Sequence, residues 1–143
     1  GLAGLRLGYA LSSPELGVQL QKVVVPFSVS ALQERVALAV LEQQTELQAN
    51  VELLIRGRQR LFSGLQALRA VEAYPSSANF VLFRVADAAA VHAGLLEQGV
   101  LVRRQDHLPG LEGCLRVSVG TDAETDLFLN ALERTLQTVR SEG

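Results

Sequence analysis

The second half of the chain alternates short apolar runs with helix-start signals, and this order restricts the folds open to it. The apolar runs at residues 71–74, 80–85, 100–103 and 114–119 predict strands. One helix is predicted between the second and third runs, and another after the fourth. The connections are short, which favours antiparallel neighbours and helices on one face of the sheet. The predicted fold class is therefore α+β, with a mainly antiparallel sheet.

Capping residues mark the two helix starts in this half. Asp87 is placed to cap a helix that ends at Gly99. Thr121 and Glu124 have the spacing of a capping box, which opens the terminal helix. The residues expected on the inner sides of the two helices are Val91, Leu95, Leu96, Leu127, Phe128, Ala131, Leu132, Leu136 and Val139.

The first half of the chain predicts one strand followed by a helical segment. Residues 5–11 are expected to form a buried strand that is entered from a glycine-rich loop. The run at residues 12–15, with a hydroxyl N-cap, a proline and an acid, starts a helix that ends before Pro26. Ser30 and Gln33 have capping-box spacing and open a second helix. A further start near residue 45 leaves open whether a third helix follows or the second one continues with a kink.

Composition excludes several classes of partner. The chain has 143 residues, 48% of them hydrophobic, which suits one domain with a sizeable core. Its net charge is −2 and it has no basic run, which argues against nucleic acid and anionic membrane surfaces as partners. Its apolar stretches are too short to span a bilayer. The single cysteine, Cys114, fits a reducing compartment, and the two histidines lack the spacing of a metal site.

Arg6, Arg103 and Arg116 are the candidate binding residues, because a guanidinium holds phosphate or carboxylate groups through paired N–H donors. Arg6 follows two glycines, which let the backbone approach a ligand closely. Alternation along the strand at residues 114–119 places Arg116 on the less apolar face. Each arginine is equally compatible with a solvated or salt-bridged surface position, and these patterns alone leave both interpretations open.

Three runs of sequence carry a family resemblance across nearly the whole chain. They are Gly-Leu-Ala-Gly-Leu-Arg at residues 1–6, Tyr-Pro-Ser-Ser-Ala-Asn-Phe at residues 74–80 and Gly-Cys-Leu-Arg-Val-Ser-Val-Gly-Thr at residues 113–121. Together they resemble histidinol-phosphate aminotransferases, which are fold-type I enzymes that use pyridoxal 5'-phosphate. In that family the cofactor-binding lysine lies just before the first run. The resemblance therefore implies that this lysine is upstream of Gly1 and that the chain itself holds no catalytic residue.

The resemblance also implies a role for each arginine and a domain division. Arg6 would bind the cofactor phosphate, Arg116 the substrate carboxylate or another anionic group, and Arg103 the substrate phosphate. Arg104 stands where the family often has an acid, so the charge next to Arg103 differs here. Residues 1–26 would be the end of the large cofactor-binding domain. Residues 27–143 would be the small C-terminal domain.

The implied function is amino transfer between histidinol phosphate and 2-oxoglutarate in histidine biosynthesis, by a cytoplasmic homodimer. The partners would be a phosphorylated amine and a 2-oxo acid, without nucleic acid, membrane or metal, and the chain alone would be inactive because it lacks the lysine. Threonine-phosphate decarboxylases of cobalamin synthesis look similar over the same runs and form one alternative. A stand-alone interaction domain derived from an aminotransferase forms another.

Overall fold

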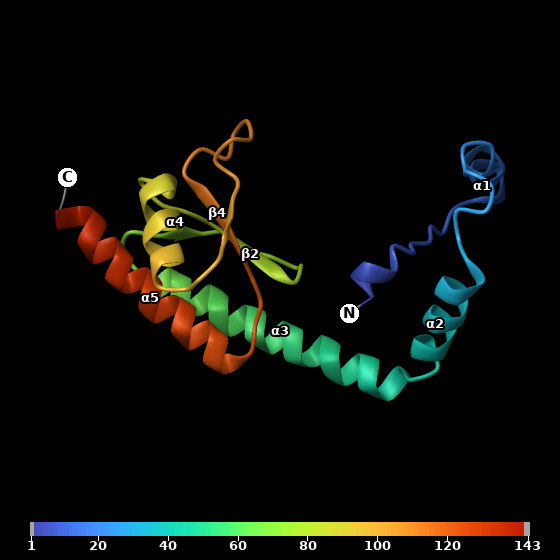
Figure 1. Cartoon of the computed structure of the whole chain (residues 1–143), viewed down its shortest axis with the longest axis horizontal. Coiled ribbons are helices and arrows are strands. Elements are labelled where there is room, and N and C mark those ends of the chain that lie inside the picture. The colour runs from blue at the N-terminus through green and yellow to red at the C-terminus, as the bar shows by residue number, and fades with distance from the viewer. Residues whose placement is uncertain (1, 142–143) are drawn as a thin grey trace. The chain divides into compact units, whose positions relative to one another are not determined.

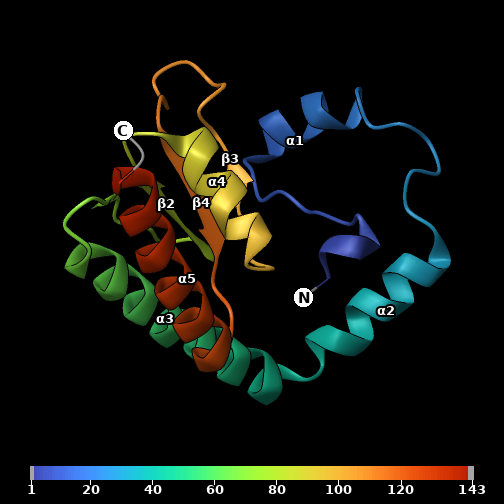
Figure 2. The same ribbon diagram turned by 60° about the vertical axis from the view of Figure 1, so that its left-hand side comes forward.

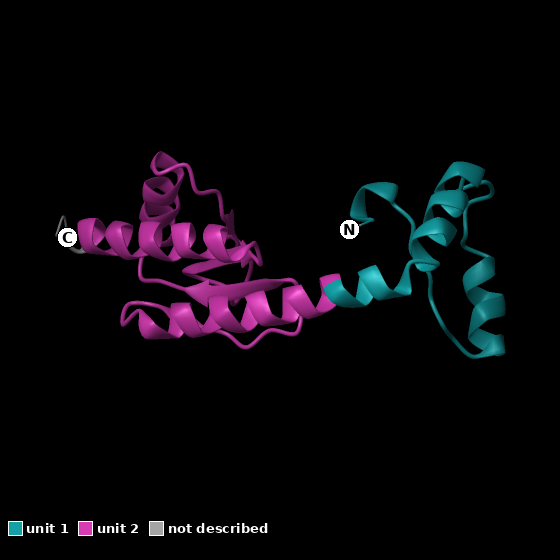
Figure 3. Ribbon diagram, turned by 90° about the horizontal axis from the view of Figure 1, so that it is seen from below, with its two compact units in different colours: residues 1–49 teal, residues 50–143 magenta. Residues whose placement is uncertain are grey.

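The computed structural model describes residues 2–141, which divide into two compact units. Unit 1 ends at Ala49 and unit 2 begins at Asn50, as Figure 3 shows by colour. The division falls inside the helix α3, Gln44–Ala67. The domain boundary predicted after residue 26 lies elsewhere in the chain and stays a prediction.

Unit 1 consists of short helices whose starts are set by local capping. It holds the 3-10 turn η1, Ala3–Leu5, and the helices α1, Pro14–Gln21, and α2, Ala31–Leu41. The Ser13 hydroxyl accepts a hydrogen bond from the Leu16 amide at 3.4 Å, as an N-cap should. Ser30 and Gln33 form the predicted capping box. Two residues, Glu42 and Gln43, separate α2 from α3, so the two are distinct helices.

The strand predicted at residues 5–11 is wrong. Leu5 ends the turn η1, Arg6 has a left-handed backbone with φ 55°, and residues 7–11 lack regular structure and are exposed. A strand needs a neighbour that takes up its amide and carbonyl groups. No strand of residues 2–141 pairs with this segment. The segment therefore has no strand partner in the described part of the chain, and its alternating apolar side chains have no sheet face to bury.

Unit 2 contains the predicted antiparallel sheet. Its strands are β1, Glu72–Ala73, β2, Phe80–Arg84, β3, Arg103–Arg104, and β4, Cys114–Ser118. They lie in the order β1-β2-β4-β3, and each neighbouring pair is antiparallel. Figure 1 labels the central pair, β2 and β4. β3 is shorter than predicted, because the Val100 amide donates to the Leu95 carbonyl at the end of the preceding helix. The α+β fold class is confirmed.

The core lies between one face of this sheet and three helices, α3, α4, Ala88–Glu97, and α5, Asp122–Ser141 (Figure 2). Val81 pairs with Val117 and Phe83 with Leu115, so all four side chains point to the same face. The Phe83 and Phe128 rings meet edge to face with centroids 5.9 Å apart. The helices add Leu61, Leu65, Val91, Leu95, Ala131 and Leu132 to this buried cluster.

Two residues expected on inner helix faces are exposed instead. Leu96 is 54% exposed and Leu127 is 56% exposed. Each is next to a residue that is buried, Leu95 in α4 and Phe128 in α5. Successive helix residues are turned by about 100°, and in these two pairs Leu95 and Phe128 take the core-facing position. Both expectations were wrong for this reason.

Gly113 and Gly99 form a matched pair for testing backbone strain, because both have left-handed φ values, 73° and 75°. A Cβ added to Gly113 would lie 2.5 Å from the Val85 carbonyl oxygen, whereas one added to Gly99 would meet nothing within 4 Å. We expect Gly99→Ala to lower the free energy of unfolding by about 1–2 kcal/mol. Gly113→Ala should cost about 2–4 kcal/mol because overlap adds to the same strain. Urea unfolding measures both, and equal losses would show that the contact with Val85 does not matter.

The capping box that starts α5 should make stability depend on pH. Hydrogen bonds from the Thr121 amide at 2.7 Å and hydroxyl at 2.8 Å hold the pKa of Glu124 below its ordinary value of 4.5. A group whose pKa is lowered by folding stabilises the fold above its unfolded pKa, and that contribution is lost as the pH falls through the folded pKa.

Glu124→Gln tests this dependence, because an amide oxygen still accepts both hydrogen bonds but does not titrate. We subtract the unfolding free energy of the variant from that of the wild type. We expect this difference to be smaller at pH values below 4.5 than at pH 7. Urea unfolding at both pH values gives the difference, in which the other acids cancel. A difference that is independent of pH would contradict the assigned bonding.

Candidate functional site

A groove of about 740 Å³ lies in unit 2, where β3 and the end of β4 meet the start of α5. Arg103 and Arg116 line it from the two strands, and Ser118 lines it two residues further along β4. The other lining residues are mainly apolar, with Leu101 and Leu127 exposed, and Glu124 adds one acid. The groove thus joins a cationic wall to an apolar one, which suits an anion that carries an organic body.

Arg103 and Arg116 are brought together directly by the sheet. They are partners in the antiparallel register of β3 and β4, so both side chains leave the same face next to each other. Two like charges directly opposite each other destabilise a sheet. Among the described residues neither guanidinium has an ion-pair partner. An anion held between them would relieve this repulsion and gain paired hydrogen bonds.

The two arginines differ in how firmly they are held. Arg116 is half-buried and its guanidinium carbon lies 4.9 Å from the centroid of the Phe80 ring. This cation–π contact fixes the side chain on the sheet face without using up its N–H donors for an acid. Arg103 is exposed, on the edge strand. Arg116 is therefore the preorganised donor of the pair, and Arg103 is the more mobile one.

Arg104, beside Arg103, is neutralised by a local acid. Its Nε and Nη2 atoms donate to the two carboxylate oxygens of Asp106 at 3.0 and 2.6 Å. These bonds from Arg104 lower the pKa of Asp106. Arg104 therefore adds a compensated charge, and of the described residues Arg103 and Arg116 are the groove-lining cations without an acid partner.

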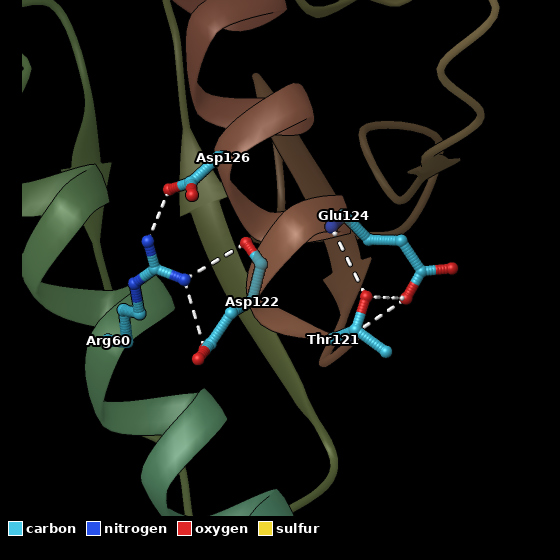
Figure 4. Close-up of polar contacts among 5 residues, drawn as sticks. All are labelled: Arg60, Thr121, Asp122, Glu124 and Asp126. Carbon is cyan, nitrogen blue, oxygen red and sulfur yellow. Dashed lines mark hydrogen bonds and ion pairs between the residues drawn. The ribbon is translucent and has the colours of Figure 1, made fainter.

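The helical wall of the groove is fastened by ion pairs at the start of α5 (Figure 4). Arg60 of α3 donates to the Asp122 carbonyl at 2.9 Å and pairs with its carboxylate at 3.0 Å. It also pairs with Asp126, and these acids, Asp126 most strongly, raise the pKa of Arg60. Glu124, which lines the groove, points one carboxylate oxygen at Thr121, as Figure 4 shows. This wall is therefore tied to α3 rather than free to close.

Arg6 lies in unit 1 and is far from β3 and β4 along the sequence. Its amide donates to the Ala3 carbonyl at 3.3 Å, and its left-handed backbone ends the turn η1. The side chain is exposed, and among residues 2–141 it has no ion-pair partner. A Cβ added to the flanking Gly4 or Gly8 would meet nothing within 4 Å, so the backbone around Arg6 is open to a ligand.

The structure adds lining residues that the sequence did not single out. Ser118 follows Arg116 by two residues, and this spacing alone would have placed both on one face. Leu101 and Leu127 were expected in a strand and in the core, but they are exposed and line the groove. The sequence feature that could have indicated their exposure is that each directly neighbours a buried residue, Val100 or Val102 for Leu101 and Phe128 for Leu127.

The remaining candidates are explained by structure. Cys114 is buried and free. Lys22 directly follows α1, and its ammonium donates to the exposed Gln19 side chain at 2.7 Å. Within the described part of the chain, no three His, Cys, Asp or Glu side chains form a group that could hold a metal ion. No helix in that part is long and apolar enough to cross a membrane.

Comparison with known proteins places the chain in a family. The model of aminotransferase class I and II matches residues 1–132. Histidinol-phosphate aminotransferase of Deinococcus radiodurans is 42% identical over 132 residues, which cover 92% of this chain and 37% of that protein. The chain thus spans well under half the length of this curated relative.

Solved structures agree with this assignment. Histidinol-phosphate aminotransferase from Sinorhizobium meliloti, in complex with pyridoxal-5'-phosphate, is 29% identical with a TM-score of 0.82, covering 97% of this chain and 39% of that one. L-threonine-O-3-phosphate decarboxylase from Porphyromonas gingivalis is 28% identical with a TM-score of 0.81, covering 94% and 42%. The chain belongs to the class I and II aminotransferase family.

Proposed function

We propose that the chain is the C-terminal part of a pyridoxal-phosphate-dependent aminotransferase that transfers an amino group between histidinol phosphate and 2-oxoglutarate. The observation that carries this proposal is the pair Arg103 and Arg116, which line one groove as register partners and have no acid partner among the described residues. The similarity to histidinol-phosphate aminotransferases supports the choice of substrate. Both the phosphorylated amine and the 2-oxo acid are anions that such a pair can bind.

The cofactor would be pyridoxal 5'-phosphate, and Arg6 fits its phosphate. The Arg6 guanidinium is exposed and has no ion-pair partner among residues 2–141, and the glycines beside it leave space for a ligand. When bound, this cofactor supplies an electron sink for the substrate's amino-bearing carbon. We place the lysine that would hold the cofactor covalently upstream of Gly1, as the family resemblance implies. The groups of this chain would bind and orient, and they would not move protons.

The two groove arginines would divide the substrate anions. Arg116, fixed over Phe80, would hold the carboxylate of glutamate or 2-oxoglutarate. Histidinol phosphate has no carboxylate, so for this substrate Arg116 and Arg103 would both bind the phosphate. The apolar wall of Leu101 and Leu127 would exclude water from the bound anion, which strengthens each charge-assisted bond.

A threonine-phosphate decarboxylase is the second candidate. The likeness to the Porphyromonas gingivalis decarboxylase favours it, and its substrate also carries a phosphate and would suit the same pair. Assays of the longer gene product with histidinol phosphate and with threonine phosphate separate the two. For the third alternative, a stand-alone interaction domain, the gene upstream of Gly1 decides: an in-frame Ser-Lys run supports the enzyme, and a start codon there supports the domain.

The remaining features of the proposal concern assembly and location. We propose a homodimer in the cytoplasm, because the family resemblance implies both. The domain division after residue 26 belongs to the same proposal. Sedimentation of the longer gene product tests the dimer.

Incubation of the 143-residue chain with pyridoxal phosphate, followed by borohydride reduction, should leave Lys22 essentially unlabelled. Lys22 is the only lysine, and its ammonium is exposed and bonded to Gln19 rather than placed beside an anion site. Peptide mass spectrometry measures the labelling, and Lys22→Arg gives the background. Stoichiometric labelling together with turnover of an amino donor would overturn the proposed location of the lysine.

In the longer gene product, Arg103→Ala and Arg116→Ala should weaken substrate binding and spare the cofactor, whereas Arg6→Ala should do the reverse. Loss of one charge-assisted contact should lower affinity roughly ten- to a hundredfold. Arg104→Ala is the matched control, because its charge is already paired with Asp106. Cofactor titration and half-reaction kinetics with histidinol phosphate and glutamate give the two readouts. If Arg116→Ala lowers cofactor affinity and leaves both half-reactions unchanged, the assignment is wrong.

A further inference from the structure

We propose that Gln33 is a positioning residue for Arg6, because its carboxamide fixes the peptide group that leads into Arg6 and so sets the direction of the guanidinium. The proposal rests on the cofactor role proposed for Arg6. Nothing in the family motif of residues 1–6 points to Gln33, which lies 28 positions after Leu5 in the chain.

The Gln33 side chain is bonded at both of its polar atoms. Its Oε1 atom accepts from the Ser30 amide at 2.7 Å, which is one half of the capping box of α2. Its Nε2 atom donates to the Leu5 carbonyl at 2.8 Å. The orientation of the carboxamide follows from its partners, because the Ser30 amide can only donate and the Leu5 carbonyl can only accept. One side chain thus joins the start of α2 to the loop that carries Arg6.

The bond to Leu5 holds the peptide group directly before Arg6. The carbonyl of this group is the acceptor for Gln33, and its amide, that of Arg6, donates to the Ala3 carbonyl. The peptide plane is therefore held at both ends. Arg6 follows it with φ 55°, and such a strained left-handed residue persists only where contacts around it hold the backbone in place. Gln33 and the turn η1 provide that fixation.

A pair of substitutions separates the capping bond from the bond to Leu5. Gln33→Glu keeps an acceptor for the Ser30 amide, since glutamate is a normal capping-box residue, but its carboxylate has no donor for the Leu5 carbonyl. Gln33→Met removes both bonds without adding charge. Ser30→Ala weakens the cap and leaves the Gln33 donor in place. Gln44→Glu is the matched control, because Gln44 also donates to a backbone carbonyl, that of Leu41, but within its own turn.

NMR relaxation of the 143-residue chain tests the bond itself. We expect amide order parameters near 0.85 at Leu5 and Arg6 in the wild type and Gln44→Glu, and values falling toward 0.6 in Gln33→Glu and Gln33→Met. The amides of the first turn of α2 should stay ordered in Gln33→Glu and loosen in Ser30→Ala. Unchanged order at Leu5 and Arg6 in both Gln33 variants would overturn the proposal.

A second measurement tests the consequence for the cofactor phosphate. The longer gene product is titrated with pyridoxal phosphate and with pyridoxal, and the ratio of the two affinities isolates the phosphate contribution. We expect both Gln33 variants to lower this ratio about three- to tenfold, as the loss of one neutral hydrogen bond would, and Gln44→Glu to leave it unchanged.

The two proposals fail in different ways. If Arg6→Ala leaves the ratio unchanged, the cofactor role of Arg6 is wrong, and the proposal that Gln33 positions it for the phosphate is overturned with it, although the NMR result still shows whether the loop is held. If Arg6→Ala lowers the ratio while Gln33→Glu and Gln33→Met do not, the cofactor role stands and the positioning role of Gln33 is overturned.

Discussion

The pairing of β2 with β4 is the interaction on which the rest of unit 2 depends. Its register places Phe83 opposite Leu115 and Val81 opposite Val117, which builds the sheet side of the core. Because side chains alternate, the same register turns Arg116 to the opposite face, where it lies over Phe80. A slip by one residue would bury the arginine and expose the core at once. Burial of the apolar face thus fixes the position of the cationic one.

Unit 1 obeys a different constraint, because none of residues 2–56 is buried. Its helices are set by local bonds, the Ser13 cap and the capping box of Ser30 with Gln33. Large apolar side chains such as Tyr9, Leu11 and Phe27 are almost fully exposed. Burial of such side chains is the main source of folding free energy. Local hydrogen bonds, such as that from Gln33 to Leu5, are therefore the contacts that order the described part of unit 1.

This contrast explains which elements could be predicted from sequence. The strands at residues 80–84 and 114–118 and the caps at Asp87 and Thr121 depend on near neighbours in the chain or on periodic burial, and both are visible as patterns. The strand predicted at residues 5–11 depended on partners that no local pattern supplies. The prediction that Leu96 and Leu127 face the core was wrong. Each is an apolar residue next to a buried one, and the spacing of apolar residues along a helix does not show which of two neighbours faces the core.

The site shows the same limit. Spacing alone selected Arg116 as a residue on the polar face of a strand, but that Arg103 stands directly opposite it became visible only through the register of β3 with β4. The short strand β3 begins at Arg103, after a segment still tied to the end of α4. The number of residues between the two arginines does not determine whether they pair. Whether they pair depends on how the loop after Arg104 folds back toward β4. In this loop Asp106 forms an ion pair with Arg104.

Absence of an ion-pair partner does not by itself identify a binding arginine. Arg35 and Arg69 also lack an acid partner among residues 2–141, and water solvates such exposed cations at little cost. Arg103 and Arg116 differ because the register of β3 with β4 places them directly opposite each other, in a groove that also has apolar lining residues. Like charges in such a position destabilise a sheet. Because Arg103 is exposed, water screens part of this repulsion, and an anion bound between the two guanidinium groups would offset the rest.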